Sequence, residues 1–143
     1  MSVKQISIFI ENKEGRIKKA INTLSKANIN IRALSIADTS KYGILRLIVS
    51  DNKKAIKALE NDGFIVKENE VVIVEVPDEP NGLNSALEIL DKEKINVEYM
   101  YAFISNKSDQ AIVVMRFDNI ENGKSLLKAH NAKLLSSEDI KEL

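Results

Sequence analysis

The chain has 143 residues, of which 44% are hydrophobic and 29% charged, and its 21 Lys and Arg balance its 21 Asp and Glu. A net charge of zero removes the long-range attraction that nucleic-acid and anionic-membrane binders use to approach their partners. The absence of cysteine excludes disulfides, thiol nucleophiles and thiolate metal sites. No apolar run approaches the length of a membrane span, and no signal peptide is evident, so we expect a cytoplasmic protein.

The first half of the chain predicts the element order strand, helix, strand, strand, helix, strand. Ile6, Ile8 and Ile10 occupy alternate positions, as in a half-buried strand. Residues 17–27 carry apolar side chains at the spacing of one buried helical stripe. In chain order we expect a strand at 3–10, a turn at 11–15, a helix at 17–27, strands at 29–37 and 44–49 around a turn at 38–43, a helix that begins at Asp51 or Asn52, and a short strand at 64–67.

The second half repeats this pattern. A shift of 66 residues superimposes the apolar positions and the helix exit: Ile17, Ala20, Ile21, Leu24, Ile29, Asn30 and Ile31 fall on Leu83, Ala86, Leu87, Leu90, Ile95, Asn96 and Val97. A repeat of this length that occurs only twice indicates two copies of one small domain, at 1–69 and 70–143. We expect strands at 71–76, 97–105, 111–117 and 133–135, turns at 78–82 and 106–110, one helix at 83–90 and another after Asn119.

This order predicts an α+β fold of two ferredoxin-like βαββαβ copies, each an antiparallel sheet with its helices on one face. The strands at 44–49 and 111–115 are apolar at both phases of the pleat, whereas a sheet covered on one face alternates. We therefore expect the second face to be covered as well, by the sister copy or by another chain. Since a copy of about 70 residues is also marginal in size, we expect a homodimer.

Catalysis finds little support in the residue types. The single histidine, His130, lies at a predicted helix end and is more simply a surface side chain than a catalytic base. The glycines are too widely separated for a phosphate loop, and no metal ligands stand at a motif spacing. We interpret the carboxylate pairs Asp78-Glu79 and Glu138-Asp139 as solvated or capping charges. We expect no enzyme activity, no cofactor and no metal.

The first turn of each copy, at 11–16 and 77–82, carries the candidate binding chemistry. Each turn leads into the N-terminus of an amphipathic helix, where free backbone N–H groups and the helix dipole suit a carboxylate. Asn12 or Asp78 could accept hydrogen bonds from an ammonium group, and Gly15 lets a ligand approach the backbone. Together these groups would bind both ends of a free amino acid. The alternative is that these residues only turn the chain and cap the helix.

These turns, with the exits at 27–31 and 95–97, resemble the ACT domain family over almost the whole chain, as two copies. The chain is most similar to stand-alone bacterial proteins made of two ACT domains. The family pattern is a loose Asp/Asn-x-Pro-Gly-x-Leu turn, a helix and an Asn-Ile exit. The resemblance implies a ferredoxin-like fold and a regulatory, allosteric role. It also implies that a free amino acid binds at the interface between paired ACT domains, and that a partner enzyme of amino-acid metabolism is regulated.

In such pairs the turn of one domain faces the second strand of its partner. The resemblance therefore implies turns formed by Asn12, Lys13, Glu14, Gly15, Arg16 and Ile17 and by Asp78, Pro80, Asn81, Gly82 and Leu83, and facing strands formed by Ser35, Ile36, Ala37 and Asp38 and by Tyr101, Ala102 and Phe103.

Both turns depart from the family pattern. Glu14 stands in place of the usual Pro, and Asn81 matches Gly15, so the second copy lacks the expected glycine. Since Asn tolerates the left-handed backbone, we expect the turn to form, with its side chain beside the helix N-terminus. Our hypothesis is that the two sites are unequal and that the Gly15 site binds better. Isothermal titration that finds two identical sites, both surviving Gly15→Val, would contradict it.

Two rival interpretations stay open. A structural or adaptor protein would bind a partner protein through an exposed sheet face or strand edge, with its turns filled by its own side chains. A small ferredoxin-like enzyme would need a cleft with a convergent His or carboxylate pair, which the sequence does not offer. Tyr99 and Tyr101 share one strand face, but the zero net charge favours packing over nucleic-acid stacking.

Overall fold

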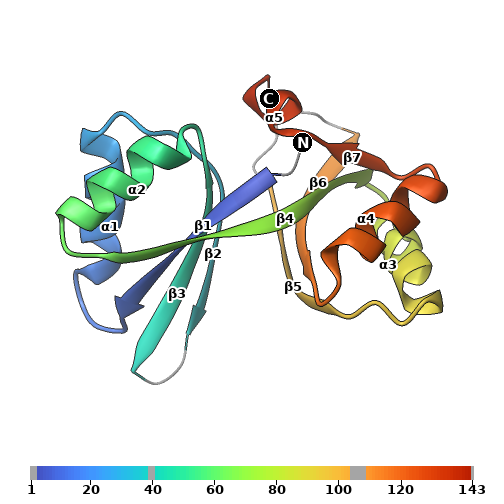
Figure 1. Cartoon of the computed structure of the whole chain (residues 1–143), viewed down its shortest axis with the longest axis horizontal. Coiled ribbons are helices and arrows are strands. Elements are labelled where there is room, and N and C mark those ends of the chain that lie inside the picture. Colours follow the sequence, from blue (N-terminus) through green and yellow to red (C-terminus); the bar gives the residue numbers. More distant parts are fainter. Residues whose placement is uncertain (1–2, 39–40, 104–108, 143) are drawn as a thin grey trace. The chain divides into compact units, whose positions relative to one another are not determined.

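The computed structural model describes residues 3–38, 41–103 and 109–142, which form two compact units (Figure 1). The first unit spans Lys4–Asn69, and the second holds the described residues from Glu70 onward together with Val3. None of the helices in the described ranges is long and apolar enough to cross a membrane. Each unit is described by itself below.

The first unit is one βαββαβ copy. Its elements are β1 (Val3–Glu11), α1 (Arg16–Lys26), β2 (Ile31–Asp38), β3 (Tyr42–Val49), α2 (Asn52–Asn61) and the beginning of β4 (Ile65–Pro77). Strand β3 pairs antiparallel with both β1 and β2, and the strand order is β2-β3-β1-β4. Helices α1 and α2 cover one face, because the inward residues of β1 and β3 cluster with the buried stripes of both helices: Ile6, Ile8, Ile10, Leu45 and Leu47 with Ala20, Leu24, Ala55 and Leu59.

The second unit repeats this arrangement. After β4 come α3 (Gly82–Lys92), β5 (Val97–Ala102), β6 (Gln110–Phe117), α4 (Ile120–Ala129), β7 (Lys133–Leu135) and α5 (Ser137–Lys141). The strand order is β7-β4-β6-β5, the same as in the first unit once the strands are matched. The core again joins one sheet face to two helices, and it contains Val72, Val74, Val76, Ala86, Leu90, Val113, Met115, Phe117 and Leu127. The predicted α+β fold of two ferredoxin-like copies is therefore confirmed.

The predicted helix caps are confirmed at both second helices. The Asp51 side chain accepts a hydrogen bond from the Lys54 amide at 3.1 Å, and Asn119 accepts one from the Asn122 amide at 3.1 Å. These bonds satisfy donors that the helix itself leaves without an acceptor. Gly63 follows α2 with a φ of +88°, a conformation that favours glycine.

Three sequence predictions need correction. The strands expected at 64–67 and 71–76 are one continuous strand, β4, because the polar stretch between them contains no Gly or Pro to end it. Strand β5 ends at Ala102, and residues 104–108 of the predicted strand and turn lie outside the described residues. Helix α5 was not predicted. It begins at a capping box in which Ser136 and Asp139 hydrogen-bond reciprocally, and it buries Ile140.

The face of each sheet that points away from the helices also carries buried apolar side chains, as the apolar strands predicted. Ile48, Ile112 and Val114 point away from the helices and are at most 2% exposed. The same face of β1 carries the buried polar residues Gln5 and Ser7. Gln5 donates to the Ser7 hydroxyl at 3.3 Å, and that hydroxyl donates to Asn69 Oδ1 at 3.0 Å, so the burial of these groups is compensated.

Candidate functional site

The turn between β1 and α1 holds the first set of candidate residues. The Asn12 amide donates to the Lys41 carbonyl at 2.9 Å, which ties the turn to the start of β3, and the Arg16 amide donates to the Lys13 carbonyl at 3.3 Å. Gly15 closes the turn with φ +85° and ψ −12°. This left-handed conformation requires glycine or a tolerant residue such as asparagine.

The turn between β4 and α3 has nearly the same backbone. The Asp78 amide donates to the Asp109 carbonyl at 3.1 Å, and the Gly82 amide donates to the Glu79 carbonyl at 3.0 Å. Asn81 takes the place of Gly15 with φ +76° and ψ −5°. The prediction that Asn81 still permits the turn is therefore confirmed, and the two copies present equivalent backbones to a ligand.

The side chains beside the two helix starts differ. A methyl group built on Gly15 would meet nothing within 4 Å, so this position is open. At the matching position Asn81 Nδ2 donates to the Ser85 hydroxyl at 3.1 Å, and Asn81 Oδ1 accepts from Asn84 at 2.9 Å. These bonds hold the Asn81 side chain over the first turn of α3. The space that is open in the first copy is thus occupied in the second.

Helices α1 and α3 also lack the side-chain caps that the other helices have. Asp51, Asn119 and Ser136 cap α2, α4 and α5, whereas Gly15 and Asn81 make no capping bond to their own helices' first amides. The amides of the second and third residues of α1 and α3 therefore have no acceptor within the helix. Such a helix start combines hydrogen-bond donors with the positive end of the dipole and accommodates a carboxylate.

The two turns differ in charge, since the first has two anions and two cations whereas the second has two anions only. In the first turn Glu11 forms ion pairs with Lys13 at 3.1 Å and with Arg16 at 3.8 Å. The Arg16 guanidinium also lies over the buried Phe64 ring, with its carbon 5.8 Å from the ring centroid. The exposed Glu14 makes the fourth charge of this turn. The second turn has Asp78 and Glu79 and no cation between Pro77 and Gly82.

The candidate strand residues lie two strands away from the turn of their own copy. Gly43 of β3 pairs with Ile10 of β1 on one side and with Asp38 of β2 on the other. Strand β3 thus separates the Gly15 turn from Asp38 by two strand spacings, about 10 Å. In the second copy β6 lies between β4 and β5 in the same way. A site that joins a turn to a second strand therefore needs a strand from another domain.

The strand candidates differ in exposure. Ile36, Ala37 and Asp38 are exposed and Ser35 is half-buried. In the second copy Ala102 is exposed and Tyr101 half-buried, whereas Phe103 is only 8% exposed. The Phe103 amide donates to the Ile112 carbonyl at 2.7 Å, beside the end of β5. Among the turn residues, Ile17 is 44% exposed, while Gly82 is buried against Pro77.

The sequence comparison then assigns the family. A family model described as the ACT domain pair matches residues 1–143. The chain belongs to the ACT domain pair family. No curated protein sequence matches the chain.

Solved structures of ACT domain proteins and their relatives resemble this chain. Protein BT0572 from Bacteroides thetaiotaomicron is 42% identical, with a TM-score of 0.92 over 100% of this chain and 98% of that one. The regulatory subunit of aspartate kinase from Thermus thermophilus, in a ligand-free form, is 15% identical, with a TM-score of 0.67 over 90% of each chain. The corresponding subunit from Thermus flavus is 17% identical, with a TM-score of 0.64 over 90% of each chain. At these identities the two kinase subunits show a shared fold.

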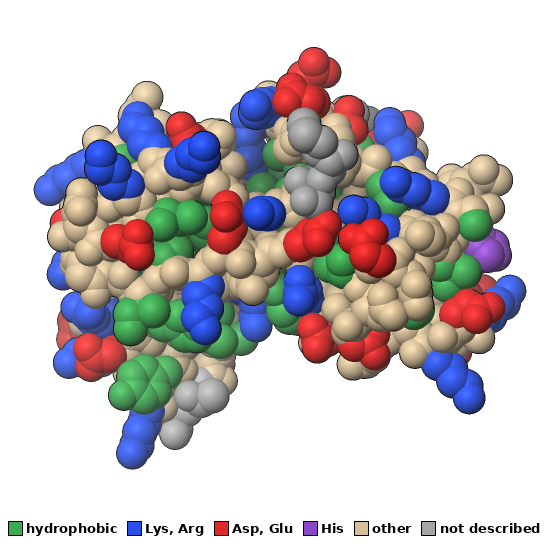
Figure 2. Space-filling view, in the orientation of Figure 1, with side chains coloured by type: hydrophobic (Ala, Val, Ile, Leu, Met, Phe, Trp, Pro, Cys, Tyr) green, Lys and Arg blue, Asp and Glu red, His purple; other side chains and the backbone are tan. Residues whose placement is uncertain are grey.

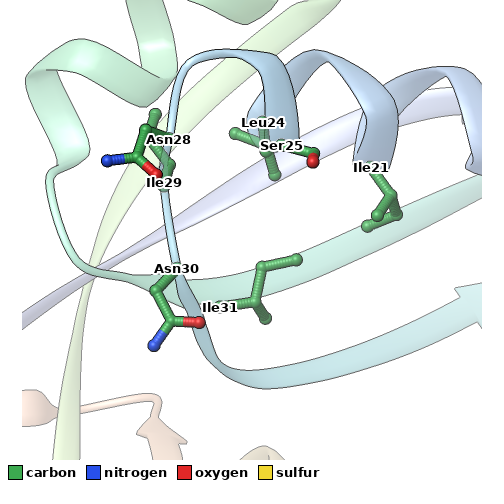
Figure 3. A pocket seen from close by; sticks show the side chains of 7 residues that line it. All are labelled: Ile21, Leu24, Ser25, Asn28, Ile29, Asn30 and Ile31. Atoms are coloured by element: carbon green, nitrogen blue, oxygen red, sulfur yellow. The ribbon is translucent and has the colours of Figure 1, made fainter.

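Each ACT domain also has a groove, with a mixed polar and apolar lining, that the sequence analysis did not predict. In the first domain it has a volume of about 450 Å³ and lies between the C-terminal half of α1 and the start of β2 (Figure 3). Its lining is Ile21, Leu24, Ser25, Asn28, Ile29, Asn30 and Ile31. The second domain has the equivalent groove of about 370 Å³, lined by Asn84, Leu87, Glu88, Leu90, Asp91, Ile95, Asn96 and Val97. The positions that revealed the repeat are thus largely those that line the grooves.

The described part of the ACT domain pair shows no other cluster of candidate functional side chains. In residues 3–38, 41–103 and 109–142 no group of three or more His, Asp or Glu side chains could hold a metal ion. His130 is the exposed cap residue at the end of α4, where its Nδ1 lies 3.0 Å from the Leu126 carbonyl oxygen. Asp139, one of the predicted capping carboxylates, caps α5.

Proposed function

We propose that this ACT domain pair is a non-catalytic regulatory module that binds a free amino acid at the interface between paired ACT domains. The observation that carries the proposal is the uncapped start of α1 and of α3, each directly after a left-handed residue at the same place in its copy. Amide donors at a helix N-terminus suit the ligand carboxylate, and Asn12 or Asp78 beside them suits its ammonium group.

The distance between turn and second strand supports a site shared by two domains. Because β3 or β6 separates them within a copy, the turn of one domain would complete its site with β2 or β5 of another. Residues 35–38 and 101–103 would then face the ligand's side chain. A ligand that bridges two domains would stabilise their pairing, and this stabilisation is how binding would reach a partner enzyme.

The two sites would not be equal. The first turn leaves open the space beside the helix start, whereas the Asn81 side chain occupies it in the second. The first turn balances Glu11 and Glu14 with Lys13 and Arg16, whereas the second has Asp78 and Glu79 and no cation. An anionic group is favoured by nearby cations and disfavoured by nearby carboxylates. We therefore assign the stronger binding to the Gly15 site.

The test is thermal unfolding of the purified protein against each of the twenty amino acids at millimolar concentration. A ligand at 100 times its Kd stabilises the native state by about 2.7 kcal/mol, which raises the Tm of a chain of this size by roughly 5 to 10 °C. A shift for one or a few amino acids supports the proposal and names the ligand class. No shift for any amino acid contradicts it.

A matched pair of variants connects the shift to the turn. Gly15 and Gly63 have φ values of +85° and +88°, and neither position has a neighbour within 4 Å of a new methyl group. Asn tolerates this conformation, so Gly15→Asn and Gly63→Asn should cost similar, small amounts of stability. Only Gly15→Asn, which copies Asn81, should weaken the ligand response. Equal responses in both variants would exclude the Gly15 site, and two identical sites by isothermal titration would contradict the stronger binding assigned to it.

An adaptor function is the second candidate, and one observation favours it. Ile17 of α1 with Leu34 and Ile36 of β2 are 44%, 44% and 45% exposed, as in a surface that binds another protein. The adaptor proposal predicts no response to any amino acid and a loss of partner binding in Leu34→Ser.

A further inference from the structure

The neutral chain is made of two halves with large and opposite charges. Lys4–Asn69 contains 13 Lys and Arg against 7 Asp and Glu, whereas 70–143 contains 8 against 14. The formal charges are therefore +6 and −6. Figure 2 shows charged side chains of both signs on each unit, with Lys and Arg prominent on the first. The zero net charge of the whole chain conceals this separation.

The separation extends to the equivalent helix and edge strand of each copy. Helix α1 carries Arg16, Lys18, Lys19 and Lys26 and no acidic residue. Helix α3 carries Glu88 and Asp91 against one lysine, and both acids line its groove. We call α1 with β2 the basic face, and α3 with β5 the acidic face. The matched strand positions Arg32 of β2 and Glu98 of β5 are also opposite in charge, although β2 ends with Asp38 and is neutral in total.

Both faces have the features of a surface that another domain covers. In the described residues β2 pairs only with β3 and β5 only with β6, so each is the open edge of its sheet. Open edges with exposed apolar side chains tend to pair with further strands. The basic face exposes Ile17, Leu34 and Ile36, and the acidic face exposes Met100 at 40%. Each face also includes one groove beside its helix, with a mixed polar and apolar lining.

We propose that the basic face of one chain docks on the acidic face of a second copy of this chain, and that the second copy's basic face docks on the first copy's acidic face. Contacts between like faces would bring lysines against lysines and carboxylates against carboxylates, and such contacts oppose association. Contacts between unlike faces are complementary, and two of them close the assembly at two chains. This inference rests on the proposed function in one respect: it specifies which ACT domains form the pairs between which the amino acid would bind.

Charge reversal tests this pairing. The basic-reversed variant is Lys18→Glu with Lys26→Glu, and the acidic-reversed variant is Glu88→Lys with Asp91→Lys. All four side chains are exposed on their helices. The matched control is Lys53→Glu with Lys57→Glu, which makes the same charge change on the exposed side of α2, outside both faces. Mass is measured by sedimentation over a range of concentration, in low and in high salt, without any amino acid.

Pairing of a basic face with an acidic face, which we call unlike-face pairing, predicts a distinct set of sedimentation results. The wild-type protein and the control should be dimers that salt weakens, because screening shortens the reach of charge. Each reversed variant alone should dissociate, with a Kd at least about tenfold higher, because both of its contacts become like-charged. The variant with all four reversals should recover the dimer, because every pair is again opposite. An equimolar mixture of the two reversed variants should form a mixed dimer.

Other outcomes overturn the proposal. Pairing of like faces predicts that the reversed variants dimerise as the wild type does and that the fourfold variant gains nothing. A monomeric wild-type chain would exclude docking on a second copy. Circular dichroism shows whether each variant folds. If a reversed variant is only weakly stable alone, the mixture of the two reversed variants still tests the pairing, because the mixed dimer restores opposite charges at both contacts. A failed amino-acid response would leave these results unchanged, so the two proposals fail separately.

Discussion

Replacing Gly82 with alanine should force the turn between β4 and α3 apart and measurably lower the free energy of unfolding. A methyl group on Gly82 would come within 2.0 Å of the Pro77 carbonyl oxygen and 3.1 Å of its carbon. An uncompressed contact between carbon and oxygen needs more than about 3 Å, so one backbone segment must move by about 1 Å. Both partners are backbone, so no side-chain rotation relieves the contact. We expect a loss of about 3 kcal/mol in the free energy of unfolding of the second unit.

Chemical unfolding measured by circular dichroism tests this value against Gly43→Ala. A methyl group on Gly43 would have its nearest neighbours at 3.6 Å, an ordinary contact, so the change should stay within about 1 kcal/mol. Arg16 occupies the position in the first copy that corresponds to Gly82, and there a side chain is tolerated. A loss for Gly82→Ala as small as that for Gly43→Ala would show that the close approach does not constrain the turn.

Two further predictions concern stability. Asp51→Ala should cost about 1 kcal/mol by freeing the Lys54 amide, whereas Asp91→Ala, which caps no helix start, should cost less in the same unfolding assay. Lys133→Met should lower the free energy of unfolding near pH 7, because it removes the cation 2.8 Å from Glu75, whose side chain is only 7% exposed. Adding Glu75→Gln to Lys133→Met should recover stability, and no recovery would contradict the pairing.

The same ion pair predicts a pH dependence. The hydrogen bond and negative charge of Glu75 raise the pKa of Lys133 above its ordinary value of 10.5. The pair thus contributes its full stability below pH 10.5, and the contribution is lost as the pH rises through the raised pKa of the folded state. Unfolding measured between pH 9 and 11 should show this loss in the wild type and not in Lys133→Met. An identical slope in both proteins would exclude Lys133 as its source.

The repeat made much of the fold predictable from the sequence. Each buried helical stripe appeared twice at one spacing, so an ambiguous segment in one copy was resolved by its counterpart in the other. Continuity of β4 was missed because the polar residues 67–70 were interpreted as a break, although they contain no Gly or Pro to interrupt the strand. Helix α5 has no counterpart in the first copy, and its capping box at Ser136 was the available signal.

The candidate site was predictable in its backbone and less so in its side chains. Gly15 and Asn81 indicated a left-handed residue before each helix, and both have that conformation. The bonds of Asn81 to Ser85 and Asn84 were not foreseen, because an asparagine at such a position can point to either side of the turn. The charge separation was visible in the sequence, but the balanced total concealed it until each domain was counted alone.

Unlike-face pairing also determines which strand completes each candidate site. If the basic face of one chain meets the partner's acidic face, the Gly15 turn lies opposite β5, which carries Tyr101, and not opposite a second β2. A chain with Gly15→Asn and a chain with Tyr101→Ala should then each lose the stronger amino-acid response. A mixture of the two should recover part of it, because one site in the mixed dimer joins an intact turn to an intact strand.

A chain that carries both Gly15→Asn and Tyr101→Ala is the control, since no mixture with itself can restore that site. Titration calorimetry on the mixed and the control proteins measures the number of strong sites. Under like-face pairing Tyr101 lies away from the Gly15 turn, and Tyr101→Ala would leave the stronger response intact. The backbone symmetry of the two copies would then have outweighed the opposite charges of α1 and α3.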